Sequence, residues 1–298
     1  MKFPPIRYLR PSALPQALDD LKQHDGSIKV LAGGQSLFPL MAMRLTEPEI
    51  ILDINALDEL KEIRDMGDCL AIGALIRHQQ LIEDVTIQQQ TPVLSLVARH
   101  IGHLAIRCRG TIGGSLVHSD PSAELPLAIC ALDGELIVQS ADETKVVPAE
   151  EFFLSYLTSA VAANEMLTTI RVPKMANQTK IAFDEVASRA GDFALVSVLA
   201  IVTFRDDGAI QRARLAIGGV SDVPFRARDA ELLMNDAALT PELVTRVART
   251  VSEAIEPVGD LHASADFRRH LARVLTGRVL NKVIAGAKGD LSWNPSVW

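Results

Sequence analysis

Two glycine-rich segments of the chain combine backbone freedom with polar donors. The first runs from Leu31 to Leu37 (LAGGQSL) and follows the apolar run Ile28 to Leu31, which predicts a strand. Gly33 and Gly34 allow positive φ and a close approach of the backbone to a ligand. Their amides, with those of Gln35 and Ser36, can form an anion-binding nest that suits a pyrophosphate. The alternative interpretation is a plain turn between a strand and a helix.

The second segment begins at Gly110 (GTIGGS) and continues to Pro126, again with a glycine pair beside hydroxyl groups. Asp120 and Glu124 follow, and carboxylates of this kind can accept hydrogen bonds from ribose or ribityl hydroxyls. A glycine-rich surface loop is the alternative interpretation. Two loops with the same chemistry in one chain favour a dinucleotide site.

Several other site types are disfavoured. Neither loop has the G-x-G-x-x-G spacing of a Rossmann domain or the G-x-x-x-x-G-K-[ST] spacing of a P-loop. His100 and His103 have no cluster of cysteine or acidic ligands beside them, which favours loop or cofactor contacts over a metal site. No serine lies in a nucleophile elbow. The sequence therefore predicts neither a catalytic residue nor a metal ligand in this chain.

The composition excludes further function classes. The net charge of -7 argues against a nucleic-acid binder. The three cysteines, Cys69, Cys108 and Cys130, are a poor framework for disulfides or an iron–sulfur cluster, and each is interpreted as a small buried apolar residue. The N-terminus has no apolar signal region, and the run Leu37 to Met43 is too short to span a bilayer. These features predict a cytoplasmic protein without a transmembrane segment.

The elements that must position the two loops follow from the hydrophobic pattern. A helix capped by Ser12 is expected around residues 14–21 and another over 37–43. A hairpin is expected over 60–75, turning at Asp65 to Asp68, and residues 110–126 are interpreted as a functional loop. Further expected elements in this half are a helix over 92–101 and strands over 28–31, 49–54, 136–138 and 165–172.

The C-terminal part changes in character after a polar linker at 173–179. Three apolar runs predict strands at 181–186, 195–204 and 213–217, with a hairpin turn at Asp206 to Gly208. Thr240 and Pro241 begin a helix expected to reach about Ala254, and another long helix is expected within 262–285. Strands followed by helices predict an α+β domain.

These segments together resemble the FAD-binding medium subunits of molybdenum hydroxylases, a family that includes xanthine dehydrogenase, aerobic carbon monoxide dehydrogenase and the N-heteroaromatic hydroxylases. The first glycine loop with Pro39, Met41 and Arg44 resembles the first FAD motif of that family. The second loop resembles its second motif. Arg189 to Leu195 (RAGDFAL) and Ala216 to Val220 (AIGGV) resemble segments of its C-terminal domain. The resemblance covers essentially the whole chain in the right order.

The resemblance implies a two-lobed FAD domain of the PCMH/vanillyl-alcohol-oxidase-like type over residues 1–174, with lobes at about 1–55 and 56–174 and the cofactor between them. It implies a small antiparallel sheet with helices over 178–288, and a tail at 289–298. Phe193 is expected either to approach the flavin ring or to lie in the core at a strand start. The cofactor-binding residues that the family implies are Leu31, Ala32, Gly33, Gly34, Gln35, Ser36, Leu37, Ile101, Gly110, Thr111, Gly113, Gly114, Ser115, His118, Asp120, Glu124, Leu167 and Phe193.

Three departures from the family pattern stand out. Ser115 occupies a position that is often asparagine. Glu185 stands where xanthine dehydrogenases carry a lysine near the flavin, which puts electrostatic tuning of the ring and reactivity with NAD in doubt. The chain has no cysteine-rich insertion, which disfavours the branch with an extra four-iron cluster, the 4-hydroxybenzoyl-CoA reductases.

The resemblance implies that the chain binds FAD and passes electrons, while a small subunit carries two [2Fe–2S] clusters and a large subunit carries the molybdenum cofactor and hydroxylates the substrate. FAD would reduce an external acceptor, and the assembly would be a dimer of heterotrimers. Two alternatives remain open. One is a stand-alone flavin oxidoreductase with its own substrate pocket, and the other is a cofactor-free assembly protein.

Overall fold

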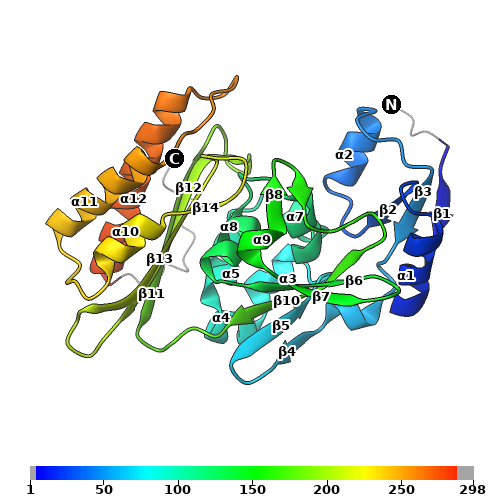
Figure 1. The fold of residues 1–298 in the computed structure, drawn as a ribbon, viewed down its shortest axis with the longest axis horizontal. Helices are drawn as coiled ribbons and strands as arrows, with labels where there is room; N and C mark the ends of the chain where they lie inside the picture. Colours follow the sequence, from blue (N-terminus) through cyan, green and yellow to red (C-terminus); the bar gives the residue numbers. More distant parts are fainter. Residues whose placement is uncertain (1–4, 287–298) are drawn as a thin grey trace. The chain divides into compact units, whose positions relative to one another are not determined.

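The computed structural model describes residues 5–286, which form two compact units (Figure 1). Within the described part, the first unit contains residues up to Thr91, then 103–120 and 133–174. The second contains 92–102, 121–132 and the chain from Met175 onward. Two segments that precede residue 174 therefore group with the C-terminal part of the chain.

The first unit contains a parallel sheet in the order β1 (Arg7–Leu9), β3 (Ile50–Asp53), β2 (Ile28–Leu31). Leu31 pairs with Asp53, so β2 and β3 end at the same edge of this sheet. Helix α1 (Leu14–Gln23) packs its apolar face into the same core. The predicted cap was wrong, because the N-cap of α1 is Ala13 and the amide of Ser12 instead donates to the side chain of Gln16.

A five-stranded antiparallel sheet completes the framework of the first unit. Its order is β4 (Ile63–Asp65), β5 (Cys69–Gly73), β10 (Met166–Pro173), β6 (Glu135–Gln139) and β7 (Thr144–Pro148). The predicted hairpin between β4 and β5 is confirmed, with Gly67 at φ 97° in its turn. The remaining elements of this unit are α2 (Leu37–Ala42), η1 (Asp58–Lys61), α3 (His78–Glu83), α4 (Val85–Gln90), α6 (Leu104–Arg107), α7 (Ile112–His118), α9 (Ala149–Phe152), β8 (Phe153–Ser155) and β9 (Thr158–Ser159).

The prediction of a loop over 110–126 was wrong, since α7 and the start of α8 (Glu124–Ala131) lie inside that range. Thr111 caps α7 by accepting a hydrogen bond from the Gly114 amide at 3.1 Å. Glycine is needed at position 113 of this helix because a Cβ there would lie only 2.7 Å from the carbonyl oxygen of Ala74. Close packing, rather than loop mobility, explains this glycine.

The second unit is built on an antiparallel sheet in the order β11 (Thr179–Ala187), β12 (Ala194–Phe204), β13 (Ile210–Gly218), β14 (Phe225–Arg226). The three predicted strands are confirmed as β11, β12 and β13. The predicted turn between the last two contains Gly208 at φ 84°. A long run such as β12 alternates its side chains between two faces of the sheet.

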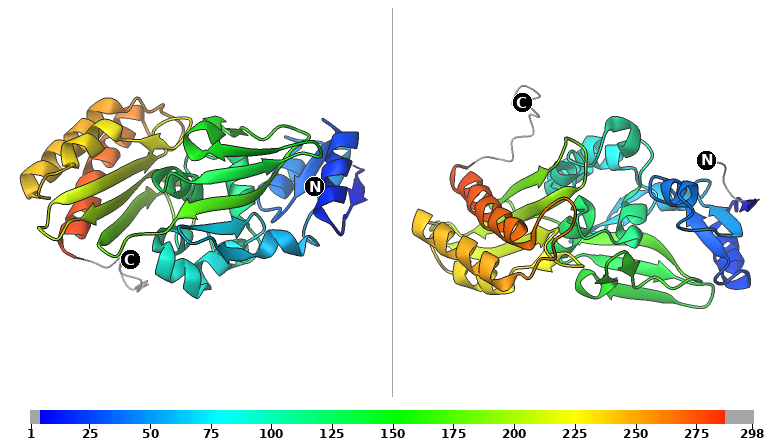
Figure 2. Two further views of the ribbon diagram at one scale, coloured as in Figure 1. Left: turned by 60° about the horizontal axis from the view of Figure 1, so that its bottom comes forward. Right: turned by 90° about the horizontal axis from the view of Figure 1, so that it is seen from above.

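Both faces of this sheet are covered within the second unit. Val196, Val198 and Val202 point into a core shared with α11 (Pro241–Ala254) and α12 (Ala265–Ile284), which run side by side (Figure 2). The intervening Leu199 and Ile201 are also buried. Helix α10 (Arg228–Met234) contacts β13, while α5 (Pro92–Ala98) contacts β11 and α8 contacts β12 and β13.

The long helices follow their sequence signals. Thr240 caps α11 by accepting from the Leu243 amide at 3.3 Å, as predicted, and Ser264 caps α12. The predicted tail at 289–298, with Trp293 and Trp298, lies outside the described residues. Within residues 5–286, no helix combines the length and apolar character needed to cross a membrane.

The cysteines follow the predicted burial only in part. Cys130 is buried in α8, Cys69 is half-buried, and Cys108 is exposed. The prediction of a buried residue was therefore wrong for Cys108, which follows the short helix α6 at the surface of the first unit. Burial, together with the nearby Asp68, raises the pKa of the Cys69 thiol.

A buried ion pair ties the helices of the second unit to its sheet. Glu231 accepts from the guanidinium of Arg226 at 2.8 Å and from the Leu215 amide at 2.7 Å, and both side chains are 10% exposed. Arg226 also donates to the Cys130 carbonyl at 2.7 Å. Removing the Glu231 carboxylate would leave the Arg226 guanidinium without its counter-charge and the Leu215 amide without its acceptor.

We predict that Glu231→Ala lowers the free energy of unfolding by about 3–5 kcal/mol, as expected for breaking a buried pair. Chemical denaturation measures this change. Glu253→Ala is the matched control, because Glu253 pairs with Arg249 at 3.9 Å on an exposed surface and should cost less than about 1 kcal/mol. Equal losses in the two variants would contradict the role given to Glu231.

Candidate functional site

The first glycine loop leaves the parallel sheet at the end of β2. The side chain of Leu31 packs with Met41 and Ile51, and Leu37 lies against the same cluster. These apolar contacts anchor both ends of the loop. Between them Gly34 has φ 73°, a conformation that favours glycine. The Gln35 side chain donates to the Gly33 carbonyl at 3.0 Å.

The backbone amides of this loop are available to a ligand. In the described part of the chain, the amides of Gly33, Gly34, Gln35 and Ser36 have no acceptor. Four successive amides without acceptors form a donor set for an anion. This arrangement fits the pyrophosphate of a dinucleotide.

The second glycine loop uses its amides differently. Ile112 and Gly113 donate to the carbonyls of Ile76 and Ala74, both at 2.9 Å, and Gly114 donates to the Thr111 hydroxyl oxygen. These bonds fix the loop against the segment that leaves β5. The Thr111 hydroxyl accepts from the Gly114 amide and keeps its own proton for another acceptor.

The two loops are in direct backbone contact. A Cβ at Gly33 would lie 2.5 Å from the Arg109 carbonyl oxygen and 2.8 Å from the Gly110 Cα. The structure thus brings together the two motifs that the sequence singled out. It also changes the explanation for Gly33, because a side chain there would strike the other loop rather than a ligand.

His78 supports the second loop from behind. It is buried, and its Nε2 donates to the Thr111 carbonyl at 2.9 Å, which leaves Nδ1 without a hydrogen-bond partner among the described residues. A Cβ at Gly110 would lie 2.7 Å from the ring. Burial lowers the pKa of His78 to about 4, so the ring is neutral near pH 7.

A polar network that the sequence analysis missed joins the two loops. Asn55 donates to the Ala32 carbonyl at 2.8 Å and accepts from Arg77 at 2.5 Å, and Arg77 also donates to the Arg109 carbonyl. Asp53 accepts from Asn55 at 2.6 Å. The available signal was the polar pair formed by Asp53, the last residue of buried strand β3, and Asn55, two residues later.

Asp53 anchors the outer end of that network. It accepts from the Tyr8 hydroxyl and, at 2.9 Å, from the Asn55 amide. Burial raises the pKa of Asp53, but these hydrogen bonds outweigh it, so the pKa lies below its ordinary value. The carboxylate therefore stays charged near neutral pH.

The other predicted residues fall into both compact units. Leu167 is buried in β10 of the first unit, beside Val138. His118 and Asp120 also lie in the first unit, and burial lowers the pKa of His118. The residues Ile101, Glu124 and Phe193 belong to the second unit.

Phe193 and Glu124 differ in exposure. Phe193 precedes β12 and is 57% exposed, so the alternative of a core phenylalanine was wrong. Glu124 is buried at the start of α8. Their predicted contacts with the cofactor stay predictions.

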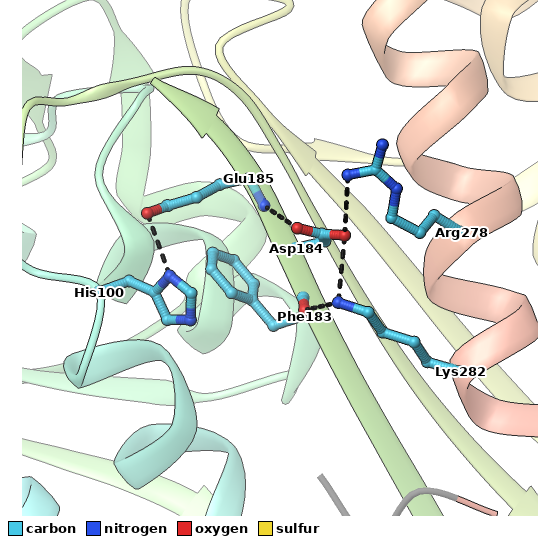
Figure 3. A network of polar contacts seen from close by, with 6 residues as sticks. All are labelled: His100, Phe183, Asp184, Glu185, Arg278 and Lys282. Carbon is cyan, nitrogen blue, oxygen red and sulfur yellow. Dashed lines mark hydrogen bonds and ion pairs between the residues drawn. The ribbon is translucent and has the colours of Figure 1, made fainter. Parts of the chain in front are cut away.

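In the second unit, the Glu185 side chain contacts the His100 ring (Figure 3). Its Oε1 lies 3.1 Å from His100 Nδ1, and the His100 ring meets Phe183 edge-on, with centroids 4.7 Å apart. The neighbouring Asp184 points to the other side of β11, where Lys282 donates to it at 3.1 Å. His100 thus contacts a carboxylate of its own unit.

We predict that His78 makes the protein less stable in mild acid. The pKa of His78 is lowered in the folded state, so the unfolded chain binds more protons between about pH 6.5 and pH 4, and stability present above pH 6.5 is lost as the pH falls. At pH 5 the loss is about 2 kcal/mol for a shift from 6.5 to about 4.

Urea denaturation at pH 7.5 and pH 5 of the natural chain and of His78→Gln measures this contribution. Glutamine keeps a donor for the Thr111 carbonyl without a titrating ring, so the variant should lose less stability on acidification. The same loss in both proteins would show that His78 does not titrate in this range.

Comparisons with known proteins place these features in a family. The alpha subunit of the 6-hydroxypseudooxynicotine dehydrogenase complex of Paenarthrobacter nicotinovorans is 35% identical over 97% of this chain and 97% of its own length. The medium chain of carbon monoxide dehydrogenase of Hydrogenophaga pseudoflava is 31% identical over 93% of this chain and 96% of its own length.

Solved structures agree with the sequence relatives. A chain of the carbon monoxide dehydrogenase of Hydrogenophaga pseudoflava, in a form that lacks the Mo-pyranopterin moiety, matches with a TM-score of 0.92 at 32% identity, covering 96% of this chain and 99% of that one. A chain of quinoline 2-oxidoreductase of Pseudomonas putida 86 also gives a TM-score of 0.92, at 34% identity, covering 97% and 100%.

Family models cover both parts of the chain. Residues 4–175 match the FAD binding domain in molybdopterin dehydrogenase, and residues 181–283 match the C-terminal domain of the CO dehydrogenase flavoprotein. The predicted fold, a FAD-binding domain followed by a smaller C-terminal domain, is confirmed. The chain belongs to the family of FAD-binding medium subunits of molybdenum-containing dehydrogenases and hydroxylases, and is the flavoprotein component of an oxidoreductase.

Proposed function

We propose that the chain holds FAD in the cradle formed by its two glycine loops and passes electrons through it. The observation that carries this proposal is the pair of loops in backbone contact, with the amides of Gly33, Gly34, Gln35 and Ser36 available to an anion. Bound FAD supplies exchange of one or two electrons, and the protein supplies binding and orientation.

Within this proposal the residues of the chain have distinct tasks. The four free amides bind the pyrophosphate, and the Thr111 hydroxyl donates to it from the second loop. His118 and Glu124 meet the phosphate or sugar region, and Asp120 accepts hydrogen bonds from ribose or ribityl hydroxyls. The full set of proposed contacts is the one that the family resemblance implies: Leu31 to Leu37, Ile101, Gly110, Thr111, Gly113, Gly114, Ser115, His118, Asp120, Glu124, Leu167 and Phe193.

The proposal extends to an assembly of three kinds of subunit. A small subunit with [2Fe–2S] clusters delivers electrons to this chain, a large subunit with the molybdenum cofactor oxidises the substrate, and an external acceptor removes the electrons. Relatives named as medium chains and as a subunit of a dehydrogenase complex support this arrangement. A dimer of such heterotrimers in the cytoplasm is the expected form.

The contact between the two loops bears on the alternative of a cofactor-free assembly protein. Gly33 is required by the Arg109 carbonyl, so its presence alone does not argue for a ligand. The four amides that have no acceptor among residues 5–286 support a ligand, because backbone N–H groups in folded proteins normally have a hydrogen-bond partner. A stand-alone oxidoreductase is distinguished by turnover without partner chains.

We predict that Gly33→Ala reduces the affinity for FAD by about tenfold or more, since the loops must separate to admit the methyl group. Gly277→Ala is the matched control, because a Cβ at Gly277 in α12 meets nothing within 4 Å. The measurement is the flavin released per chain on denaturation, with the dissociation constant from flavin fluorescence.

The contrary outcomes are specific. Equal flavin content in Gly33→Ala and Gly277→Ala would remove the loop contact from the site. A natural chain that carries no FAD, alone or with its partner chains, would overturn the proposed function. Turnover by the purified chain alone would favour the stand-alone oxidoreductase.

A further inference from the structure

The Asn55 side chain lies at the junction of two separately built parts of the first unit. Strands β2 and β3 are parallel neighbours and end side by side, with Leu31 opposite Asp53. Two residues beyond Asp53, the Asn55 amide group reaches the Ala32 carbonyl of the first glycine loop at 2.8 Å. Its oxygen faces the other way and accepts from Arg77 at 2.5 Å.

Arg77 comes from the segment between β5 and α3, and so from the antiparallel part of the unit. Its guanidinium donates to Asn55 and to the Arg109 carbonyl, the same carbonyl that a Cβ at Gly33 would strike. The Arg77 side chain therefore contacts Asn55, which holds the first loop, and Arg109, which directly precedes the second loop.

The Arg77 guanidinium donates its hydrogen bonds to neutral groups rather than to a carboxylate. Its hydrogen-bond acceptors among the described residues are both neutral oxygens, and Asp53 is already engaged by Tyr8 and Asn55. Burial and the nearby Arg109 lower the pKa of Arg77, while Asp53 opposes them. The guanidinium therefore remains a cation, and the charged Asp53 carboxylate lies near enough to attract it.

We propose that Asn55 and Arg77 form a polar brace that fixes the spacing of the two glycine loops and preorganises the cradle for a pyrophosphate. This inference rests on the proposed function and adds two positioning residues to it. The brace acts through the loops: Asn55 holds the Ala32 carbonyl, and Arg77 holds Asn55 and the Arg109 carbonyl.

The physical reason is the cost of ordering a loop during binding. The first loop gains no stabilisation from hydrogen bonds donated by these four amides within the described residues, so other contacts must hold it in the geometry that an anion requires. Hydrogen bonds formed before the ligand arrives remove that ordering cost from the binding step. An arginine is suited to this task because its rigid fork reaches two acceptors at once.

Two other roles for the same residues make different predictions. If Arg77 served only as a positive charge for the phosphates, Arg77→Lys would bind FAD nearly as well as the natural chain, and Asn55 would be irrelevant. If the pair served only general stability, loss of FAD would follow loss of folding.

The experiment uses the full chain as Asn55→Ala, Arg77→Lys and the double variant, with Arg64→Lys as the matched control on an exposed arginine of β4. Dissociation constants for FAD, and for ADP as a probe that shares the pyrophosphate, are measured with each apoprotein. The melting temperature of each apoprotein is recorded alongside, and Gly33→Ala serves as the reference for a lost cradle.

The brace predicts that each single variant lowers the affinity for FAD and for ADP by about tenfold or more. The loss of affinity in the double variant should be much smaller than the product of the two single losses, because both residues act through the same contacts. Apoprotein melting temperatures should match that of Arg64→Lys. Natural affinity in Asn55→Ala or in Arg77→Lys would overturn the brace. So would a fall in melting temperature that accounts for the lost affinity.

The two levels of the proposal are separable in the same series. Loss of FAD by Gly33→Ala with natural affinity in the Asn55 and Arg77 variants would sink the brace and leave the cradle in place. A natural chain that binds neither FAD nor ADP would instead overturn the proposed function, and the brace with it.

Discussion

At Gly33 the backbone of one loop lies against the backbone of another, with no room for even a methyl group between them. Backbone groups have fixed geometry, so such a contact sets the distance between the loops more narrowly than side-chain packing would. The rest of the first unit is arranged to permit it. Strand β2 ends where β3 ends, the segment after β5 pairs with Thr111, and His78 fills the space behind Gly110.

The two loops then divide the work of the site. In the second loop, the amides of Ile112, Gly113 and Gly114 donate to protein oxygen atoms, which fixes that loop, while the first loop keeps four amides without acceptors in the described structure. A rigid wall facing an open donor set is a sound arrangement for an anionic group, since the donors need not be freed from other partners when the ligand binds. The Arg77 guanidinium places a positive charge next to Asn55, the residue that holds the Ala32 carbonyl of the first loop.

Sequence reasoning found the loops because paired glycines after a buried strand have few other uses, and it found most strands from their apolar runs. It could not find the brace, since Asn55 and Arg77 are ordinary polar residues whose proximity arises from strand order and pairing. It missed α7, because the glycines that mark a loop in one dimension here mark close packing against Ala74. The cysteines show the same limit of sequence reasoning, because the burial of a residue depends on which residues pack against it in the fold.

The chain passes between its two compact units five times, after Thr91, Gly102, Asp120, Leu132 and Lys174. During synthesis, α5 emerges long before β11, and α8 long before β12 and β13, the strands that these helices finally contact. Every residue of α8 is buried in the folded protein. The apolar side chains of this segment therefore stay exposed during synthesis until β12 and β13 have been made. Such interleaving also makes the halves poor candidates for separate genes, because a cut near residue 175 would strand two helices without their sheet.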